Sequence, residues 1–521
     1  MLQHHTRGAR RRGRHDARAV IAVAAAPMAV MLVLGVWDLN RAGLYIGDAA
    51  TLWAVRLPFP QLVHLLSHVD AVHTTYYLLV RSVFFLGHSY VTARATAAVG
   101  AVVAVGLTSW WGLRLTGRRT VAVVGGLLLA LSTTTSQYAQ DPRSYTIVMA
   151  CAVGVSLALV RALERDIVAG PRRWLRAWLP YLTLLVLCTY LHELSAMLLA
   201  LAQGVSLLWG RVDRRRLVHW LSAGAASAVL SLPLLVLSAT EQNAISWIQR
   251  PGLATVEALV AQFTSPVRWL AAVLVVLTVV GAVAARRRTV GPPAGLTPQR
   301  SLLPVLLLPS LLLLAESEVA RPLLQGRYVL FCLPAGCLLA ANGADRVARA
   351  VCRPRFARAA VVATLLVAVG AGQWHRQEAL RTPDGRHWNL TQAAHYLLAH
   401  AGPDEGIGYL PGHLQYVADL YPRVGHELHQ FQIAVSPRRS GSFHGIMRHG
   451  RHLAAALGRY RRVWVVREGG SAGHAPLVTM LHRERYHPVS DHAFHGGVIR
   501  LWVRGPDPRT TAELPGDGVG G

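Results

Sequence analysis

The residues best suited to chemistry are acids, histidines and arginines in short stretches between long apolar segments. A carboxylate can take a proton from an attacking hydroxyl, and a guanidinium can bind a phosphate through its planar donor fork. In chain order the candidates are Asp48, Asp70, His73, Asp141, Arg143, His192, Glu193, Glu316, Glu318 and Arg327. Such groups at the ends of apolar helices would line a cavity, which suits either an active site or a transport path.

The elements that must position these residues are membrane-spanning helices. Of the 521 residues, 53% are hydrophobic and only 15% are charged, a composition unlike that of soluble globular domains. About eleven apolar runs are long enough to cross about 30 Å of hydrocarbon. They are 19–37, 93–113, 120–137, 145–163, 175–190, 194–210, 217–239, 267–285, 301–315, 328–343 and 359–374. The first is predicted to be an uncleaved anchor, and no broken mid-membrane helix or inverted repeat is indicated.

The distribution of arginine predicts how these spans are oriented. A net charge of +27 would suggest nucleic-acid binding if it formed one patch, but the arginines concentrate in the N-terminus and in alternate loops. By the positive-inside rule, the basic N-terminus, 1–18, and those loops are cytosolic. We therefore expect a multi-pass plasma-membrane protein without a nucleic-acid partner, whose candidate residues all lie on the extracytoplasmic side.

The first outer loop, 38–92, is long and contains two helical stretches, 49–67 and 73–88. The second stretch is too short for a span and carries Arg81, so we expect an interfacial or re-entrant helix there. Counting it as a span would reverse the sidedness of every later loop and place arginine-rich loops outside.

The composition changes after the membrane domain, 19–374. Residues 375–505 mix strand-like runs (GIGYL, RRVWVVRE, GGVIRLWVR) with helix-like runs (NLTQAAHYLLAHAG, FHGIMRHGRHLAAALGRY). The fold class predicted is an all-α polytopic membrane protein with a small C-terminal α/β extracytoplasmic domain. A disordered tail, 506–521, is expected to follow.

Asp48 and the motif SHVDAVH each allow two interpretations. Asp48 could act as a general base at the membrane surface, or it could cap the helix that AATLWAV predicts, and one residue can do both. His68, Asp70 and His73 suggest a metal site, but His68 and His73 would lie on different faces of a helix. We favour capping and hydrogen bonding, with Asp70 or His73 facing a cavity, and we predict no metal ligands and no cofactor.

The later loops are also open to two interpretations. In SQYAQDPRSYTI, Asp141 and Arg143 belong either to a solvated turn or to a phosphate site, with Tyr138 beside it. His192 and Glu193 occupy a very short turn, where the histidine is either hydrogen-bonded between helices or part of a substrate cavity. Arg327 begins a late span as an interfacial anchor or as a second phosphate ligand.

Taken in order over about 40–375, four stretches resemble the GT-C superfamily of integral-membrane glycosyltransferases. The family includes protein O-mannosyltransferases, aminoarabinose transferases and mannosyltransferase-like proteins of actinobacteria. The stretches are GDAATLWAVRLPFPQLVHLLSHVDAVHTTYYLL, QYAQDPRSYTI, TYLHELS and QGRYVLFCLPA. The family usually has an Asp-Glu pair at the start of the first outer loop, where this chain has Gly47-Asp48.

This resemblance implies a reaction at the outer membrane face. An acceptor hydroxyl of a glycan, lipid or protein would attack the anomeric carbon of a polyprenyl-phosphate sugar, with mannose the expected sugar, and the configuration would invert. Asp48 is then the leading catalytic base, with Asp141 and Asp70 as alternatives. Arg143 and Arg327 would bind the donor phosphate, and Tyr138, His73, His192 and Glu193 would line the substrate cavity. A flippase or transporter of lipid-linked sugar, or a non-catalytic relative, are the other hypotheses.

Overall fold

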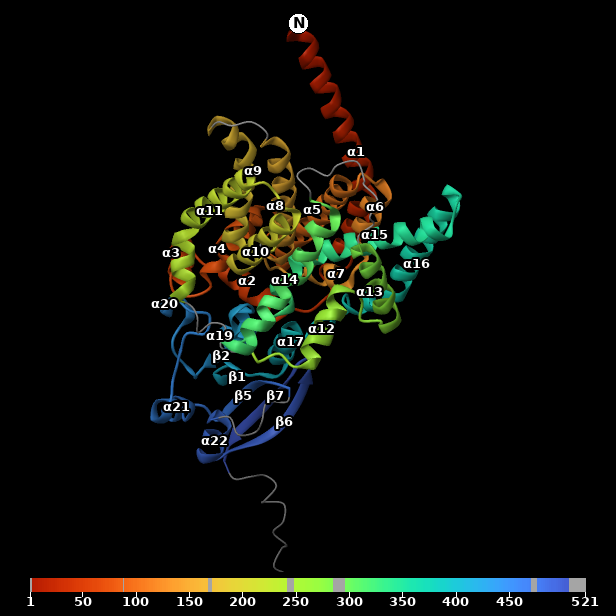
Figure 1. Cartoon of the computed structure of the whole chain (residues 1–521). Helices are drawn as coiled ribbons and strands as arrows, with labels where there is room; N and C mark the ends of the chain where they lie inside the picture. The colour runs from red at the N-terminus through yellow and green to blue at the C-terminus, as the bar shows by residue number, and fades with distance from the viewer. Residues whose placement is uncertain are drawn as a thin grey trace, which may run out of the picture. The chain divides into compact units, whose positions relative to one another are not determined.

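The computed structural model describes residues 2–87, 89–166, 171–240, 248–283, 296–469 and 476–505. The chain forms two compact units (Figure 1). One, the membrane unit, comprises Met1–Leu39, Asp70–Gly87 and Val91–Ala379, and the other, the C-terminal unit, comprises Asn40–Val69, His88–Tyr90 and Leu380–Gly521. The first outer loop is therefore divided between the two units, which the sequence did not predict. The tail expected at 506–521 lies outside the described residues.

Within the described residues, nine helices are long and apolar enough to cross a membrane. They are α1 (Leu2–Val36), α5 (Tyr90–Thr116), α8 (Tyr145–Arg165), α9 (Pro171–Leu191), α10 (Glu193–Gly210), α11 (Arg214–Thr240), α14 (Pro298–Val319), α15 (Leu333–Val351) with the short helix η5 (Gly326–Cys332) before it, and α16 (Arg355–Ala379). Two bent pairs bring the number of spans to as many as 11. The predicted polytopic helical fold is confirmed.

Two bent pairs of helices were not predicted: 120–137 was predicted as one uninterrupted span, and the span predicted at 267–285 covers only the second helix of the other pair. Helices α6 (Arg119–Leu131) and α7 (Thr133–Ala139) meet at 63°, and α12 (Leu253–Phe263) and α13 (Arg268–Ala282) meet at 72°. At the first bend, Thr133 donates from its backbone N–H and its hydroxyl to Oε1 of Gln373, each over 3.1 Å. A neighbouring helix thus supplies the acceptor that the broken helix lacks, which is how membrane helices tolerate such breaks.

Small residues allow α13 and α15 to pack closely. A Cβ atom added to Gly343 would overlap the carbonyl oxygen of Leu277, and one added to Gly281 would overlap that of Leu339. Asn342 also donates from Nδ2 to the carbonyl oxygen of Gly281 over 3.0 Å. Contacts of this kind bring helix backbones together where the lipid supplies no hydrophobic driving force between helices.

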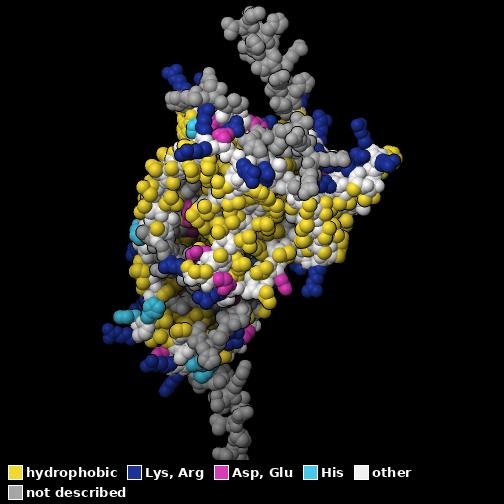
Figure 2. Space-filling model, viewed as in Figure 1, with side chains coloured by type: hydrophobic (Ala, Val, Ile, Leu, Met, Phe, Trp, Pro, Cys, Tyr) yellow, Lys and Arg dark blue, Asp and Glu magenta, His cyan; other side chains and the backbone are white. Residues whose placement is uncertain are grey.

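Ion pairs connect helix ends that the arginine pattern places on one side. Nη1 of Arg118 lies 2.8 Å from Oδ2 of Asp345, and Arg114 pairs with Glu164. The space-filling view shows arginines near the end of the membrane unit where α1 enters, next to a broad band of hydrophobic side chains (Figure 2). The helix ends expected in the cytosol therefore do lie together at one end of the bundle.

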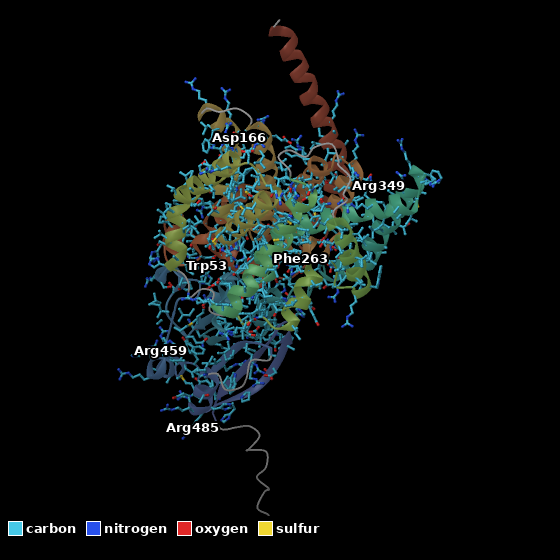
Figure 3. All side chains as sticks on the ribbon, in the orientation of Figure 1. Trp53, Asp166, Phe263, Arg349, Arg459 and Arg485 are labelled. Carbon is cyan, nitrogen blue, oxygen red and sulfur yellow. The ribbon has the colours of Figure 1, made fainter. Side chains whose placement is uncertain are left out.

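A second cluster at this end is centred on Asp166, which is labelled in Figure 3. Its Oδ2 accepts a hydrogen bond from Nε1 of Trp178 over 3.1 Å and lies 2.5 Å from Nδ1 of His219. Because Asp166 follows α8, Trp178 lies on α9 and His219 lies on α11, one carboxylate connects three spans.

The first outer loop forms short helices rather than a span. Helices α2 (Ile46–Arg56) and α3 (Phe59–Leu66) are separated at Pro58, so the single stretch predicted at 49–67 is broken. After the one-turn helix η1 (Ala71–His73), α4 (Thr74–Val83) has 10 residues. A helix of that length rises only about 15 Å, too little to cross the hydrocarbon, as the sequence predicted.

The C-terminal unit is built on a five-stranded mixed sheet in the order β2-β1-β5-β7-β6. Strand β1 (Glu405–Leu410) is parallel to β2 (Leu428–Gln430) and β5 (Arg462–Glu468). Strand β7 (Gly497–Arg504) is antiparallel to β5 and to β6 (Tyr486–Phe494). Buried residues including Val463, Leu481 and Trp502 fill the core beside the sheet. The three strand-like runs of the sequence correspond to β1, β5 and β7.

The helices of this unit agree only in part with the sequence prediction. Helix α17 (Leu390–His400) forms as expected, but only α21 (Gly450–Leu457) forms within the predicted helical run FHGIMRHGRHLAAALGRY. The beginning of that run instead contains β4 (Ile446–Met447), which pairs with β3 (Ile433–Val435). Gly445, with φ 71°, and Gly450, with φ 51°, adopt left-handed conformations that interrupt a helix there.

The first half of the outer loop belongs to this unit through specific contacts. The backbone N–H of Leu390 donates to the carbonyl of Leu44 over 3.0 Å. The ring of Tyr45 stacks on Trp388 with 5.7 Å between centroids, and Trp53 of α2 contacts the ring of Phe443. These aromatic contacts connect residues more than 300 positions apart in the chain, so local sequence patterns could not indicate them.

Candidate active site

Asp70 is the centre of a polar cluster in the membrane unit. Its Oδ1 lies 2.7 Å from Nδ1 of His73, and its Oδ2 accepts a short hydrogen bond from the hydroxyl of Tyr77. Nη1 of Arg143, which comes from the turn between α7 and α8, lies 3.9 Å from the same Oδ2. The carboxylate therefore organises two side chains of its own loop and one from a distant turn.

The backbone and electrostatics of Asp70 match this role. Its φ of 65° is left-handed, a conformation that aspartate adopts more readily than most residues. Burial alone would raise the pKa of Asp70, but the interactions with His73, Arg143 and Tyr77 outweigh burial and hold that pKa well below its usual range. Asp70 is therefore ionised at neutral pH and is a weak base.

His192 lies at the junction of α9 and α10, where its Nδ1 accepts a hydrogen bond from the backbone N–H of Ser195 over 3.2 Å. Burial lowers the pKa of His192 to about 3, and the charges of His73 and Arg327 add to that effect. The ring is therefore neutral, and its proton is on Nε2 because Nδ1 accepts. Both interpretations of this residue are compatible with the structure, since the ring caps a helix and also lies among charged candidate residues.

Arg327 begins η5 among aromatic rings. Its guanidinium lies 5.5 Å from the centroid of the Tyr328 ring, and that ring lies 5.2 Å from the ring of His192. The hydroxyl of Ser195 donates to the carbonyl of Tyr328 over 3.0 Å, which joins α10 to η5. Arg327 is thus fixed beside His192 rather than extended into solvent at an isolated helix end.

Tyr138, in α7, and Tyr145, the first residue of α8, line the same region on either side of the α7–α8 turn. Their rings are 5.6 Å apart, edge to face, and the ring of Tyr145 lies 6.0 Å from that of His192. Asp141, which is 9% exposed, lies within this turn. Nε2 of Gln140 donates to the carbonyl of Trp37 over 2.9 Å and so holds the turn against the end of α1.

Asp48 lies in the C-terminal unit and not in the membrane unit. Helix α2 begins at Ile46, and Asp48 is its third residue rather than the N-cap residue. Its Oδ2 accepts from the backbone N–H of Tyr45 over 3.4 Å, so the side chain stabilises the helix start from inside the first turn. Asp48 is fully buried, as is the neighbouring Gly47.

The remaining candidates lie nearer the periphery. Glu193 is the first residue of α10 and is half-buried, whereas Glu316 and Glu318 are exposed near the end of α14. Among the described residues, no group of three or more His, Cys, Asp or Glu side chains is arranged to hold a metal ion.

Sequence reasoning missed three aromatic members of the site, Tyr77, Tyr145 and Tyr328. Each lies next to a residue that was predicted, through a hydrogen bond to Asp70 or a ring contact with His192. The available signal was that each tyrosine begins or lies within a predicted helix close to a charged candidate. A phenol there can serve a polar ligand while its ring remains apolar.

With this geometry established, the fold can be compared with solved structures. ArnT from Cupriavidus metallidurans in the apo state is similar over 92% of this chain and 97% of that chain, with a TM-score of 0.59 and 15% identity. The chain has the GT-C fold. The structure of the same ArnT bound to undecaprenyl phosphate is similar with a TM-score of 0.50, 12% identity and the same coverage. No protein-family model and no curated protein matches the sequence.

A larger GT-C protein also resembles the chain. The arabinofuranosyltransferase AftD from Mycobacteria is similar with a TM-score of 0.50 and 16% identity, over 93% of this chain but only 40% of AftD. At such low identity the similarity establishes the fold and leaves the chemistry to the residues themselves. Gly47, which stands where the GT-C resemblance implies an aspartate, lies with Asp48 in the first turn of α2.

Proposed function

We propose that the protein is a membrane glycosyltransferase that moves a sugar from a polyprenyl-phosphate donor to an acceptor hydroxyl, with inversion. The observation that carries the proposal is the cluster of Arg143, Arg327 and neutral His192 among tyrosines in the membrane unit of a GT-C fold. Two arginines beside aromatic rings suit a phosphate on an apolar chain, because guanidinium stays charged near lipid and the rings pack against the hydrocarbon.

In this mechanism the arginines stabilise the leaving group. As the bond between the anomeric carbon and the phosphate oxygen breaks, negative charge builds on the phosphate, and the proposed role of Arg143 and Arg327 is to neutralise that charge. His192 carries its proton on Nε2 and adds a neutral donor at the same place. No nucleotide is required, because the donor already carries an activated sugar.

Asp48 is the base that we propose for the acceptor hydroxyl. An inverting attack comes from the side of the sugar opposite the departing phosphate, so the base must be separate from the phosphate-binding arginines. Asp70 lies 3.9 Å from Arg143 and has a lowered pKa, which disfavours it as the base. Asp141 precedes Arg143 by two residues and remains the alternative.

The finer parts of the proposal are the sugar, the acceptor and the orientation. We propose mannose as the sugar and a glycan, lipid or protein hydroxyl as acceptor. We further propose a cytosolic N-terminus, with the phosphate cluster and the C-terminal unit outside the cytosol. Two observations support this orientation. Arg118 pairs with Asp345 at one end of the bundle. Asp70, Arg143 and His192 gather away from that pair.

The decisive experiment uses the purified full chain in lipid nanodiscs with polyprenyl-phosphate mannose labelled in the sugar. We expect release of polyprenyl phosphate and labelling of an added cell-envelope acceptor fraction, with inverted configuration. The corresponding glucosyl and arabinosyl donors, assayed in parallel, identify the sugar. Absence of transfer from all three donors, by protein that remains folded, would contradict the proposal.

The bends between α6 and α7 and between α12 and α13 favour a second function, a transporter of lipid-linked sugar, because transporters commonly use broken helices. The charged cluster, however, lies at helix ends and not along a path through the bundle. A flipping assay in proteoliposomes distinguishes the two. Movement of the labelled lipid between leaflets without sugar transfer would support the transporter.

A further inference from the structure

The two ring nitrogens of His73 differ, because one has a hydrogen-bond partner and the other has none among the described residues. Nδ1 lies 2.7 Å from Oδ1 of Asp70, whereas Nε2 is buried and has no hydrogen-bond partner among the described residues. The residue as a whole is 9% exposed. A buried polar atom without a partner typically costs about 1–3 kcal/mol, a cost that a ligand bound at Nε2 would remove.

The second ring nitrogen belongs to the phosphate side of the proposed site. Asp70 holds the ring from one direction and is itself 3.9 Å from Arg143. The charges of His73 and Arg327 also lower the pKa of His192, after the larger effect of burial. His73 is therefore connected to both proposed phosphate ligands, and not to a separate acceptor region.

The pairing with Asp70 fixes the orientation of the His73 ring. An ionised carboxylate can only accept, so Nδ1 of His73 donates to Oδ1 of Asp70. The ring stacks near Tyr77, with 6.0 Å between centroids, and Tyr77 donates to the same carboxylate. Asp70 is thus a positioning residue that fixes the ring.

We propose that His73 is the general acid of the reaction and protonates the departing polyprenyl phosphate. This inference rests on the proposed glycosyltransferase function. The acceptor oxygen bonds to the anomeric carbon while the bond from that carbon to the phosphate oxygen breaks and its electron pair passes to that oxygen. Nε2 of His73 gives its proton to the phosphate, and the acceptor's proton passes to the base carboxylate. Proton return from that carboxylate through water restores both groups.

Among the described residues, few charged or titratable groups interact with His73. Asp70 and Tyr77 contact its ring, Arg143 lies 3.9 Å from Asp70, and His192 interacts with His73 and Arg327 electrostatically. Helices α9 and α11 also pack on η1, and their C-terminal stretches, 184–191 and 229–240, contain no acidic or basic residue. If the pH dependence of kcat disappears when His73 is replaced, it can therefore be assigned to His73 or to one of these few neighbouring groups.

The test is the pH profile of kcat at saturating polyprenyl-phosphate sugar for the full chain in nanodiscs. For the wild type we expect kcat to fall at alkaline pH as His73 loses its proton. His73→Gln keeps a donor but cannot release a proton, so kcat at neutral pH should fall about 100-fold, the KM for the donor should change little, and the alkaline fall should vanish. Asp70→Asn should also lower kcat with little change in the KM for the donor, because a carboxylate no longer holds the ring at Nδ1.

The matched control is His375→Gln, because His375 is an exposed histidine of the membrane unit on α16, and it should leave the profile unchanged. If His73→Gln retains wild-type kcat and the alkaline fall, or raises only KM, the acid role is overturned. Binding of a short-chain prenyl phosphate to each variant shows whether its site is folded. A wild type that binds prenyl phosphate but transfers no sugar would instead overturn the proposed function, and this inference with it.

Discussion

Trp37 and Trp374 stack with their ring centroids 5.2 Å apart and their planes at 28°. Trp37 follows α1 directly and Trp374 lies in the last turns of α16, so the C-terminal ends of the first and last spans lie together. The two spans therefore run in the same direction through the bilayer. Because Gln140 donates to the carbonyl of Trp37, the turn that carries Arg143 lies at this same end.

The first prediction concerns the side of the membrane that this end faces. A reporter fused after Asp141 should be active outside the cytosol, and one fused after Arg118 should be active only in the cytosol, since Arg118 pairs with Asp345 at the opposite end of the bundle. At each of the two positions, an alkaline phosphatase fusion reports a location outside the cytosol and a green fluorescent protein fusion reports a cytosolic location. A cytosolic signal after Asp141 would remove the proposed site from the outer face.

The second prediction concerns the base. Asp48→Asn should abolish sugar transfer, lowering kcat at least 100-fold, because the amide cannot take the acceptor's proton. Donor binding and membrane insertion should be unchanged, and Asn retains an oxygen that can accept from the backbone N–H of Tyr45. A single-turnover assay measures sugar transfer by this variant and by the control Asp213→Asn. Asp213 is a suitable control because its side chain is 53% exposed. Retained transfer would make Asp141 the next candidate.

The third prediction concerns the phosphate ligands. Arg143→Lys and Arg327→Lys should each weaken prenyl-phosphate binding about 10-fold to 100-fold, since a lysine keeps the charge but loses the planar donor fork. Equilibrium binding of a labelled prenyl phosphate to protein in nanodiscs measures the loss. Arg268→Lys, at an exposed arginine that starts α13, is the control. Unchanged binding in both variants would exclude the cluster as the phosphate site.

The fourth prediction concerns the contact between α13 and α15. Gly343→Ala should lower the free energy of unfolding by about 2–4 kcal/mol, because the new methyl group overlaps the backbone of Leu277 and forces the helices apart. Gly224→Ala on α11, where an added Cβ meets nothing within 4 Å, should have no such effect. Thermal unfolding in detergent compares the two variants. Equal unfolding midpoints would show that the helices can move apart without loss of stability.

The fifth prediction concerns pH and the C-terminal unit. Burial raises the pKa of Asp419 from 3.8 to about 6, against a smaller opposing effect from the Gln430 hydrogen bond. The folded unit therefore binds more protons than the unfolded chain between these two values. The contribution of Asp419 to stability is fully present below about pH 4 and is lost as the pH rises through about 6. Asp419→Asn stays neutral and should stabilise the unit by about 1–3 kcal/mol at pH 7.5, but not at pH 4.

Hydrogen exchange of β1 and β5 in the full chain, at both pH values, measures this difference locally. The comparison must be between variants, because His413 in the same unit has a pKa lowered by burial to about 4 and contributes the opposite slope. Asp404→Asn is a suitable control, since its side chain is 90% exposed and asparagine also accepts its left-handed φ of 64°. Equal protection of wild type and Asp419→Asn at pH 7.5 would contradict the prediction.

Much of the architecture could be predicted because it depends on local properties. The apolar length of segments such as 145–163 and 194–210 determines that they can span the bilayer, and α8 and α10 occupy them. Alternation in RRVWVVRE and GGVIRLWVR indicated β5 and β7 in the same way. The break between α6 and α7 escaped prediction because the acceptor for Thr133 comes from Gln373 on another helix.

The sequence by itself determined which residue types could do chemistry, the number of candidate spans and the presence of an α/β region at the end. Only the tertiary structure decided which candidates meet. It joined Asp70 and His73 to Arg143, placed His192 beside Tyr328 and assigned Asp48 to the C-terminal unit. The physical reason is that spanning a bilayer depends on the composition of one segment, whereas a site at helix ends depends on how distant segments pack.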